Sequence, residues 1–359
     1  MKEIPLFKVG MSKDASKQTS KVLKSGFIGQ GAKVDEFEQL LWEELKTEIK
    51  PVTVNSCTSA IDLALELIGV SFGDEVISSP MTCFASQVGA IHRGAEIKWA
   101  DIDPITGLID PKSIEKLVTN KTKAIICVNW AGKICDFETI KSFGIPVIED
   151  AAHTWDVFDT KGKERGDYIC YSFQAIKFLT TGDGGILICP KEKESDARLL
   201  RWFGLDRTKG QSFRCTQNIT KAGFKYQMND IAAAIGICNV PIARNSVKKH
   251  RKNSQYIIEN VENKNFILPE WDETCSYWLF SMHVLNGRKQ EFVDYLLENG
   301  VVCSPVHFRN DMYDCTLKFK EGILFGVDSF SQTQICIPNG WWLSRNDLEY
   351  VVKVLNNFN

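Results

Sequence analysis

Lys177 is the residue of this sequence that points most directly to covalent chemistry. It follows the apolar segment DYICYSF and precedes the glycine cluster of TTGDGG. Glycines allow tight turns and let the backbone approach a ligand closely. A lysine amine placed there can form a reversible covalent bond with a carbonyl compound. A lone lysine beside a loop is more commonly just solvated, so the hypothesis depends on what other segments supply.

Two other segments supply groups that would complement such an amine. Asp150 ends the apolar stretch of VIEDAAH, which places a carboxylate at the carboxyl edge of a sheet, where open α/β folds bind ligands. In NSCTSAIDLALEL, Ser56, Thr58 and Ser59 stand at a helix start, which is either an ordinary N-cap or a phosphate site. Together with Lys177 these parts could hold pyridoxal phosphate as a Schiff base, with the carboxylate keeping its pyridine nitrogen protonated.

The elements that position these groups follow from the hydrophobic pattern. Residues 34–48 repeat apolar positions at helical spacing, and short apolar runs alternate with helix-like stretches over 74–150, which predicts parallel strands. About ten residues separate DYICYSF from GGILICP, too few for a parallel crossover, so we expect an antiparallel pair there. We predict an α/β fold: a large cofactor-binding domain (1–245) with a mixed, mostly parallel sheet flanked by helices, and a smaller C-terminal α+β domain (246–359).

Composition narrows the classes of partner. Among 359 residues, 43 basic and 45 acidic side chains leave a net charge of −2, which provides no general attraction for nucleic acid or an anionic membrane. The cluster KKHRK is either a nucleic-acid patch or, as we favour, a solvated helix face. The twelve cysteines form no Cys-x-x-Cys and only five histidines accompany them, so we expect buried free thiols and no metal site. With no leader or membrane span visible, we expect a cytoplasmic protein.

The chain also resembles a known family along nearly its whole length. Besides the segments above, SGFIGQGAKVDEFE, SSPMTCFASQVGAIHRGAEIKWADIDPITGLID, RWFGLD, GFKYQMNDIAAAIG and IPNGWWLS are similar to the DegT/DnrJ/EryC1/StrS family of sugar aminotransferases, within the aspartate-aminotransferase-like fold type I group. The resemblance implies that Lys177 carries the cofactor and shuttles a proton, and that Asp150 pairs with the pyridinium nitrogen. It also implies that His153 reaches the phenolic oxygen and that Phe84 stacks on the ring.

For the cofactor phosphate, the resemblance points to Thr58, Ser59 and Ser172, and to Lys225 of the partner subunit in a homodimer with shared active sites. Two departures stand out: Cys57 occupies a position where relatives have glycine, and Lys225 replaces an asparagine in GFKYQM.

For the substrate, the resemblance points to Phe27, Asn129 and His307. The implied reaction is amino transfer from glutamate to a keto group, at C4 in preference to C3, of a nucleotide-linked deoxysugar, with pyridoxamine phosphate as the intermediate form of the cofactor. The product would be an amino sugar for an O-antigen or another glycan. Two alternatives stay open: a sugar 3-dehydratase, in which histidine replaces the lysine, and a regulator that binds the cofactor without turnover.

Overall fold

A seven-stranded sheet forms the centre of the computed structural model, which describes residues 3–155, 165–209 and 216–359. Its strands are β1 (Val52–Val54), β2 (Glu75–Ser78), β3 (Glu96–Trp99), β4 (Thr122–Val128), β5 (Val147–Asp150), β6 (Tyr168–Ser172) and β7 (Gly185–Ile188). They lie in the order β1-β7-β6-β5-β4-β2-β3. The pairs from β3 through β2, β4 and β5 to β6 are parallel, whereas β7 is antiparallel to β6 and β1. The predicted fold class is confirmed, including the antiparallel step from DYICYSF to GGILICP.

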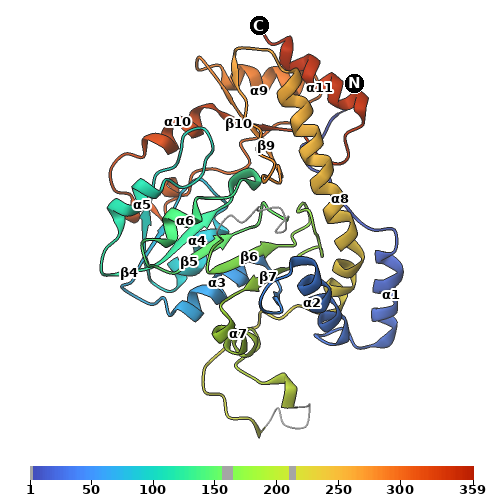
Figure 1. The fold of residues 1–359 in the computed structure, drawn as a ribbon, viewed down its shortest axis with the longest axis vertical. Helices are drawn as coiled ribbons and strands as arrows, with labels where there is room; N and C mark the ends of the chain where they lie inside the picture. The colour runs from blue at the N-terminus through green and yellow to red at the C-terminus, as the bar shows by residue number, and fades with distance from the viewer. Residues whose placement is uncertain (1–2, 156–164, 210–215) are drawn as a thin grey trace.

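Helices cover both faces of this sheet (Figure 1). They include α2 (Ala32–Leu45), α3 (Cys57–Ile68), α4 (Ala85–His92), α5 (Pro111–Leu117), α6 (Phe137–Lys141) and α7 (Glu194–Leu200), whereas α1 (Ala15–Ser25) packs on the long helix α8 (Asp230–Asn260) outside the sheet. Successive residues of β4 point to opposite faces, as in any strand. Ala124 and Ile126 join the core that contains α3, whereas Ile125 and Cys127 pack in the core formed with α5 and α6. The middle of β4 is therefore buried and apolar on both faces of the sheet.

A smaller unit stands at the end of the long helix α8 (Asp230–Asn260), which runs past α1 and α2 to reach it (Figure 1). The unit contains a three-stranded antiparallel sheet in the order β10-β9-β8, with α9, α10 and α11 around it. Its elements are β8 (Phe266–Ile267), β9 (Phe280–Val284), α9 (Lys289–Glu298), α10 (Phe325–Thr333), β10 (Gln334–Ile337) and α11 (Arg345–Asn356). The expected domain boundary at 245/246 falls inside the continuous helix α8, and it stays a prediction.

The described residues also bear on the predictions about cysteines, metal sites and membrane spans. Eleven described cysteines are free and six of them are buried. No group of three or more histidine, cysteine or acidic side chains in the described ranges is placed to hold a metal ion. Within the same ranges, no helix is both long enough and apolar enough to cross a membrane.

Candidate active site

Asp150 is the last residue of β5, so its carboxylate lies at the carboxyl edge of the sheet. Its two oxygens accept hydrogen bonds from the Ser86 hydroxyl at 2.7 Å and from the Ala152 amide at 3.1 Å. Burial raises the pKa of the Asp150 carboxyl, against the opposing effect of these hydrogen bonds and of Lys177. No described residue forms an ion pair with Asp150. The site thus contains a fixed, buried carboxyl group that lacks a directly bonded cation.

Lys177 lies in the loop between β6 and β7, and its amine faces an indole. The amine nitrogen is 3.5 Å from the centre of the Trp278 ring. Part of the Lys177 side chain reaches the surface, but the amine itself is enclosed, and burial lowers its pKa from 10.5 to about 8 despite the attraction of Asp150. A lysine with such a pKa is partly neutral near physiological pH, and the neutral amine is the form that attacks a carbonyl carbon.

Trp278 belongs to a group of stacked rings beside this amine. The His153 ring stacks on Trp278 with centroids 4.1 Å apart, and the His307 ring lies parallel to His153 at 5.7 Å. Trp130 meets both histidines edge-on. Burial lowers the pKa of His153 well below its usual range, with further lowering by Lys177 and His307, and it lowers the pKa of His307 to about 4. Both imidazoles are therefore neutral near pH 7.

Each of these two histidines also has one buried ring nitrogen without a hydrogen-bond partner among the described residues. The atoms are Nδ1 of His153 and Nε2 of His307. Buried polar atoms of native proteins nearly always have a partner. Two unpartnered nitrogens in one ring cluster next to Lys177 therefore indicate a place where a polar ligand binds.

The first turn of α3 forms the other side of the candidate site. Ser56 caps the helix, because its hydroxyl accepts a hydrogen bond from the Ser59 amide at 3.0 Å. Gly185 of β7 lies against this turn: a Cβ at that position would stand 2.8 Å from the Cys57 amide nitrogen. Ser172 is the strand neighbour of Gly185, so two predicted phosphate contacts, the helix start and Ser172, lie close together. The positive end of a twelve-residue helix at this point suits an anion.

Phe84 packs against a second aromatic ring at the start of α4. It precedes α4, and its ring meets the Tyr313 ring edge-on with centroids 5.5 Å apart. Stacking of Phe84 on the cofactor stays a prediction.

Asn129 is fully buried and both ends of its amide are engaged. Its nitrogen donates to Glu149 at 2.6 Å and its oxygen accepts from the Cys135 amide at 3.1 Å. Glu149, which directly precedes Asp150 in the chain, also pairs with the Arg165 guanidinium. These contacts favour a structural role for Asn129 in holding the end of β5. Its contact with the substrate stays a prediction.

Phe27 and Lys225 are exposed on the chain. Phe27 is 80% exposed, and the Lys225 amine lies 5.4 Å from the centre of the Phe203 ring. No contact of either side chain with Lys177 is found in the described part of the molecule. Both positions are open to a second subunit, so their predicted roles stay predictions.

Sequence reasoning missed Trp278, Trp130 and Ser86. Trp278 lies 101 positions after Lys177 in the numbering and is held by a hydrogen bond from its indole nitrogen to the Ile176 carbonyl at 3.1 Å. It was seen only as part of the apolar segment YWLFSMHVLN, which carries no chemical signal. Ser86 lies in the segment MTCFAS, which resembles the family, but nothing in the sequence indicates that its hydroxyl bonds to Asp150.

Comparison with known proteins identifies the family. The model of the DegT/DnrJ/EryC1/StrS aminotransferase family matches residues 10–356. GDP-perosamine synthase of Escherichia coli O157:H7 is 29% identical over an alignment of 376 residues that covers 100% of this chain and 99% of that protein. The structure of AtS13 from Actinomadura melliaura is 31% identical with a TM-score of 0.92 and 99% of both chains covered.

A second solved structure agrees with these matches. The sugar aminotransferase CalS13 from Micromonospora echinospora is 28% identical, with a TM-score of 0.91 and coverage of 99% of this chain and 100% of that one. The match of the family model extends over nearly all of the helices and strands described above. The chain therefore belongs to the DegT/DnrJ/EryC1/StrS aminotransferase family and is a sugar aminotransferase family enzyme.

Proposed function

We propose that this enzyme uses pyridoxal phosphate to move an amino group from glutamate to the C4 keto group of a nucleotide-linked deoxysugar. The observation that carries the proposal is the Lys177 amine, which has a pKa of about 8 and shares one site with the buried carboxyl of Asp150. Such a pair matches a cofactor that has a carbonyl group at one position and a basic ring nitrogen at another.

The residues of the site fit this cofactor. Asp150 offers a carboxyl group to a protonated ring nitrogen, and that positive charge would offset the burial that raises the pKa of Asp150. The unpartnered Nδ1 of His153 can take the phenolic oxygen. Thr58, Ser59 and Ser172, around the positive end of α3, can hold the phosphate. When bound, pyridoxal phosphate supplies a carbonyl carbon that accepts an amino group and a ring that withdraws electrons.

The chain's own residues would then divide the work. Lys177 would hold the cofactor covalently and, once released, would move a proton at the reacting carbon, which a tethered amine does better than bulk water because it is already positioned. Asp150 holds positive charge at the ring nitrogen. Trp278 covers the amine and excludes water from it, and the neutral His153 and His307 leave no competing charge beside it.

The choice of substrate is supported by the relatives. GDP-perosamine synthase is the name of a protein that matches this chain from end to end, and amination at C4 is our inference from that likeness. We further propose a homodimer, in which Lys225 of the partner subunit contacts the phosphate and Phe27 lies near the substrate. His307, parallel to His153, is the proposed substrate contact within the same chain.

The test begins with the purified enzyme. We expect a visible absorption band from bound cofactor, attachment of the cofactor to Lys177 after borohydride reduction, and release of 2-oxoglutarate on addition of glutamate. Incubation with dTDP-, UDP- and GDP-linked 4-keto and 3-keto sugars should then give a product whose mass and NMR spectrum place the amine at C4.

Each alternative has its own outcome. Cofactor bound without a reducible link would favour the sugar 3-dehydratase. A link to Lys177 with no response to glutamate would favour the regulator. Amination of only 3-keto sugars would overturn the assignment to C4 and leave the aminotransferase proposal intact.

A further inference from the structure

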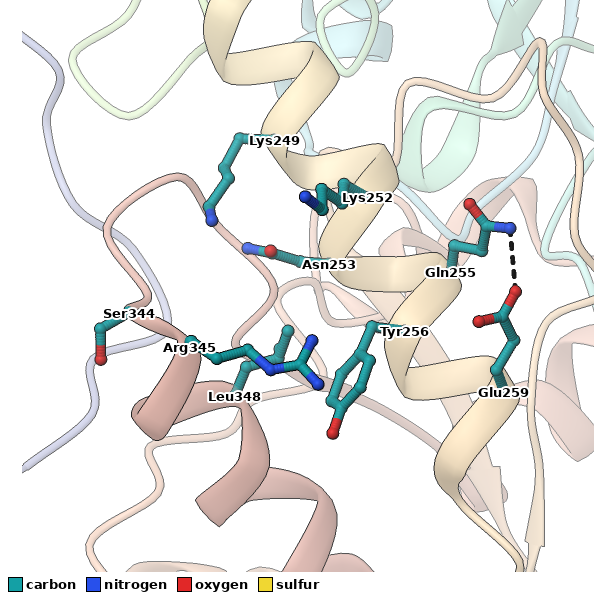
Figure 2. A pocket seen from close by; sticks show the side chains of 9 residues that line it. All are labelled: Lys249, Lys252, Asn253, Gln255, Tyr256, Glu259, Ser344, Arg345 and Leu348. Atoms are coloured by element: carbon teal, nitrogen blue, oxygen red, sulfur yellow. Dashed lines mark hydrogen bonds between the residues drawn. The ribbon is translucent and has the colours of Figure 1, made fainter.

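A basic pocket lies between α8 and α11 in the small unit, and the proposed amino transfer makes no use of it (Figure 2). It has a cavity volume of about 320 Å³, and its walls include Lys249, Lys252, Tyr256, Arg345 and Leu348. None of these residues belongs to the candidate active site. Both lysines belong to the cluster KKHRK, which was predicted from the sequence to be a solvated helix face.

The three cations of this pocket face the same hollow. Lys249, Lys252 and Tyr256 are spaced three and four residues apart, which puts them on one face of α8. Figure 2 shows the amines of Lys249 and Lys252 and the guanidinium of Arg345 around the space between the two helices. Arg345 is the first residue of α11, whose N-terminal end adds a partial positive charge.

Acidic side chains near the pocket are already engaged. Glu259 accepts a hydrogen bond from a glutamine of its own helix at 2.9 Å. Glu349 pairs with Arg345 at 2.6 Å, and Asp347 completes the capping box of α11. By contrast, no ion-pair partner of either lysine is found among the described residues. The lining of the pocket therefore contains three cations against the one carboxylate of Glu259, and of these cations only Arg345 has an ion-pair partner among the described residues.

Both walls of the pocket are held in place before any ligand arrives. The Arg345 guanidinium lies 4.0 Å from the centre of the Tyr256 ring. The Asn253 side-chain nitrogen donates to the carbonyls of Asn339 and Gly340, at 3.0 and 2.9 Å, which ties α8 to the segment leading into α11. Arg345, Tyr256 and Asn253 are therefore ordered before binding, whereas a ligand would still have to order the amines of Lys249 and Lys252.

We propose that this pocket binds a phosphate-bearing small molecule, whose phosphoryl oxygens accept hydrogen bonds from Lys249, Lys252 and Arg345. Phosphate is the ligand class that two amines and a guanidinium recognise best. The pocket is a compact hollow closed by two helices, whereas a nucleic acid needs an extended basic stripe. The Tyr256 ring and the buried Leu348 offer apolar contact to the organic part of the ligand.

The test is isothermal titration calorimetry of the cofactor-loaded enzyme with inorganic pyrophosphate. The double variant Lys249→Gln/Lys252→Gln should bind about tenfold more weakly or worse, because it loses two charged hydrogen bonds. Lys248→Gln is the matched control: it removes the same kind of charge from the adjacent position, which lines a different hollow with Glu44 and Pro241. Its affinity should stay within about twofold of wild type.

Three results would overturn the proposal. Pyrophosphate binding that survives in the double variant would place the anion elsewhere, for example at the start of α3. An equal loss in Lys248→Gln would indicate general charge attraction. Absence of saturable binding of pyrophosphate, with binding only of a single-stranded oligonucleotide, would assign the lysines to nucleic acid.

Discussion

Replacing Lys177 by methionine should stabilise the cofactor-free chain at neutral pH. Burial lowers the pKa of this amine from 10.5 to about 8, so at pH 7 the fold contains a charged group in surroundings that disfavour the charge. At full weight the shift corresponds to about 3 kcal/mol in the free energy of unfolding. Part of the side chain reaches solvent, which reduces the expected gain to about 1–2 kcal/mol.

The sign of the pH dependence follows from proton binding. In the unfolded chain the amine keeps its ordinary pKa of 10.5, whereas in the fold it loses its proton near pH 8. Between these values the unfolded chain binds more protons, so the wild type gains stability as pH rises. The advantage of Lys177→Met is therefore full below pH 8, shrinks above it, and is gone beyond pH 10.5.

Urea unfolding of the two cofactor-free proteins at pH 7 and pH 10 measures this difference. The gain of Lys177→Met at pH 7 should shrink by more than half at pH 10. Lys177→Leu serves as a control. Leucine packs differently from methionine, so its stability relative to wild type should differ by a constant amount, but the change of that difference with pH should be the same. A difference that is constant from pH 7 to pH 10 in both variants would refute the reasoning, since it would mean that the fold does not shift this amine.

Three further substitutions test the residues and elements around the Lys177 amine. Gly185→Ala should lower the free energy of unfolding by about 2 kcal/mol in urea titrations, because its Cβ would stand 2.7 Å from the Tyr171 carbonyl oxygen and 2.8 Å from the Cys57 amide nitrogen; wild-type stability would contradict the close approach. Ser56→Ala should cost about 1 kcal/mol in thermal unfolding by removing the cap of α3, and Ser56→Asp should restore most of it. Asp150→Asn should slow glutamate-dependent release of 2-oxoglutarate about a hundredfold, without lowering the free energy of unfolding at pH 7; unchanged turnover would remove the proposed role of Asp150.

The fold could be predicted because its signals are local. Apolar runs alternating with helical spacing over 74–150 indicate parallel strands, and the short gap before GGILICP indicates an antiparallel neighbour; both are confirmed. Ser56 gives the start of α3 by the same logic, because a capping hydroxyl acts on amides only three residues away.

The site could be predicted only in part. Asp150 at the end of β5 and Lys177 in a glycine-flanked loop were visible as types of residue at recognisable places. Trp278 was not visible, because nothing in an apolar segment of the small unit indicates that its indole faces the Lys177 amine. For Phe84, the aromatic expected on the cofactor, the structure shows an edge-on contact with Tyr313, and its stacking on the cofactor stays a prediction.

The amino-acid sequence is enough to indicate the succession of strands and helices along the chain, the positions of the reactive lysine and the strand-end carboxylate, and the resemblance to one family. The tertiary structure alone decided the state of those groups: the lowered pKa of Lys177, the raised pKa of Asp150, and two neutral histidines with unpartnered nitrogens. The physical reason is that patterns along a chain record contacts over a few residues. Desolvation and charge interactions depend on every side chain that the fold brings near, however far apart in the sequence.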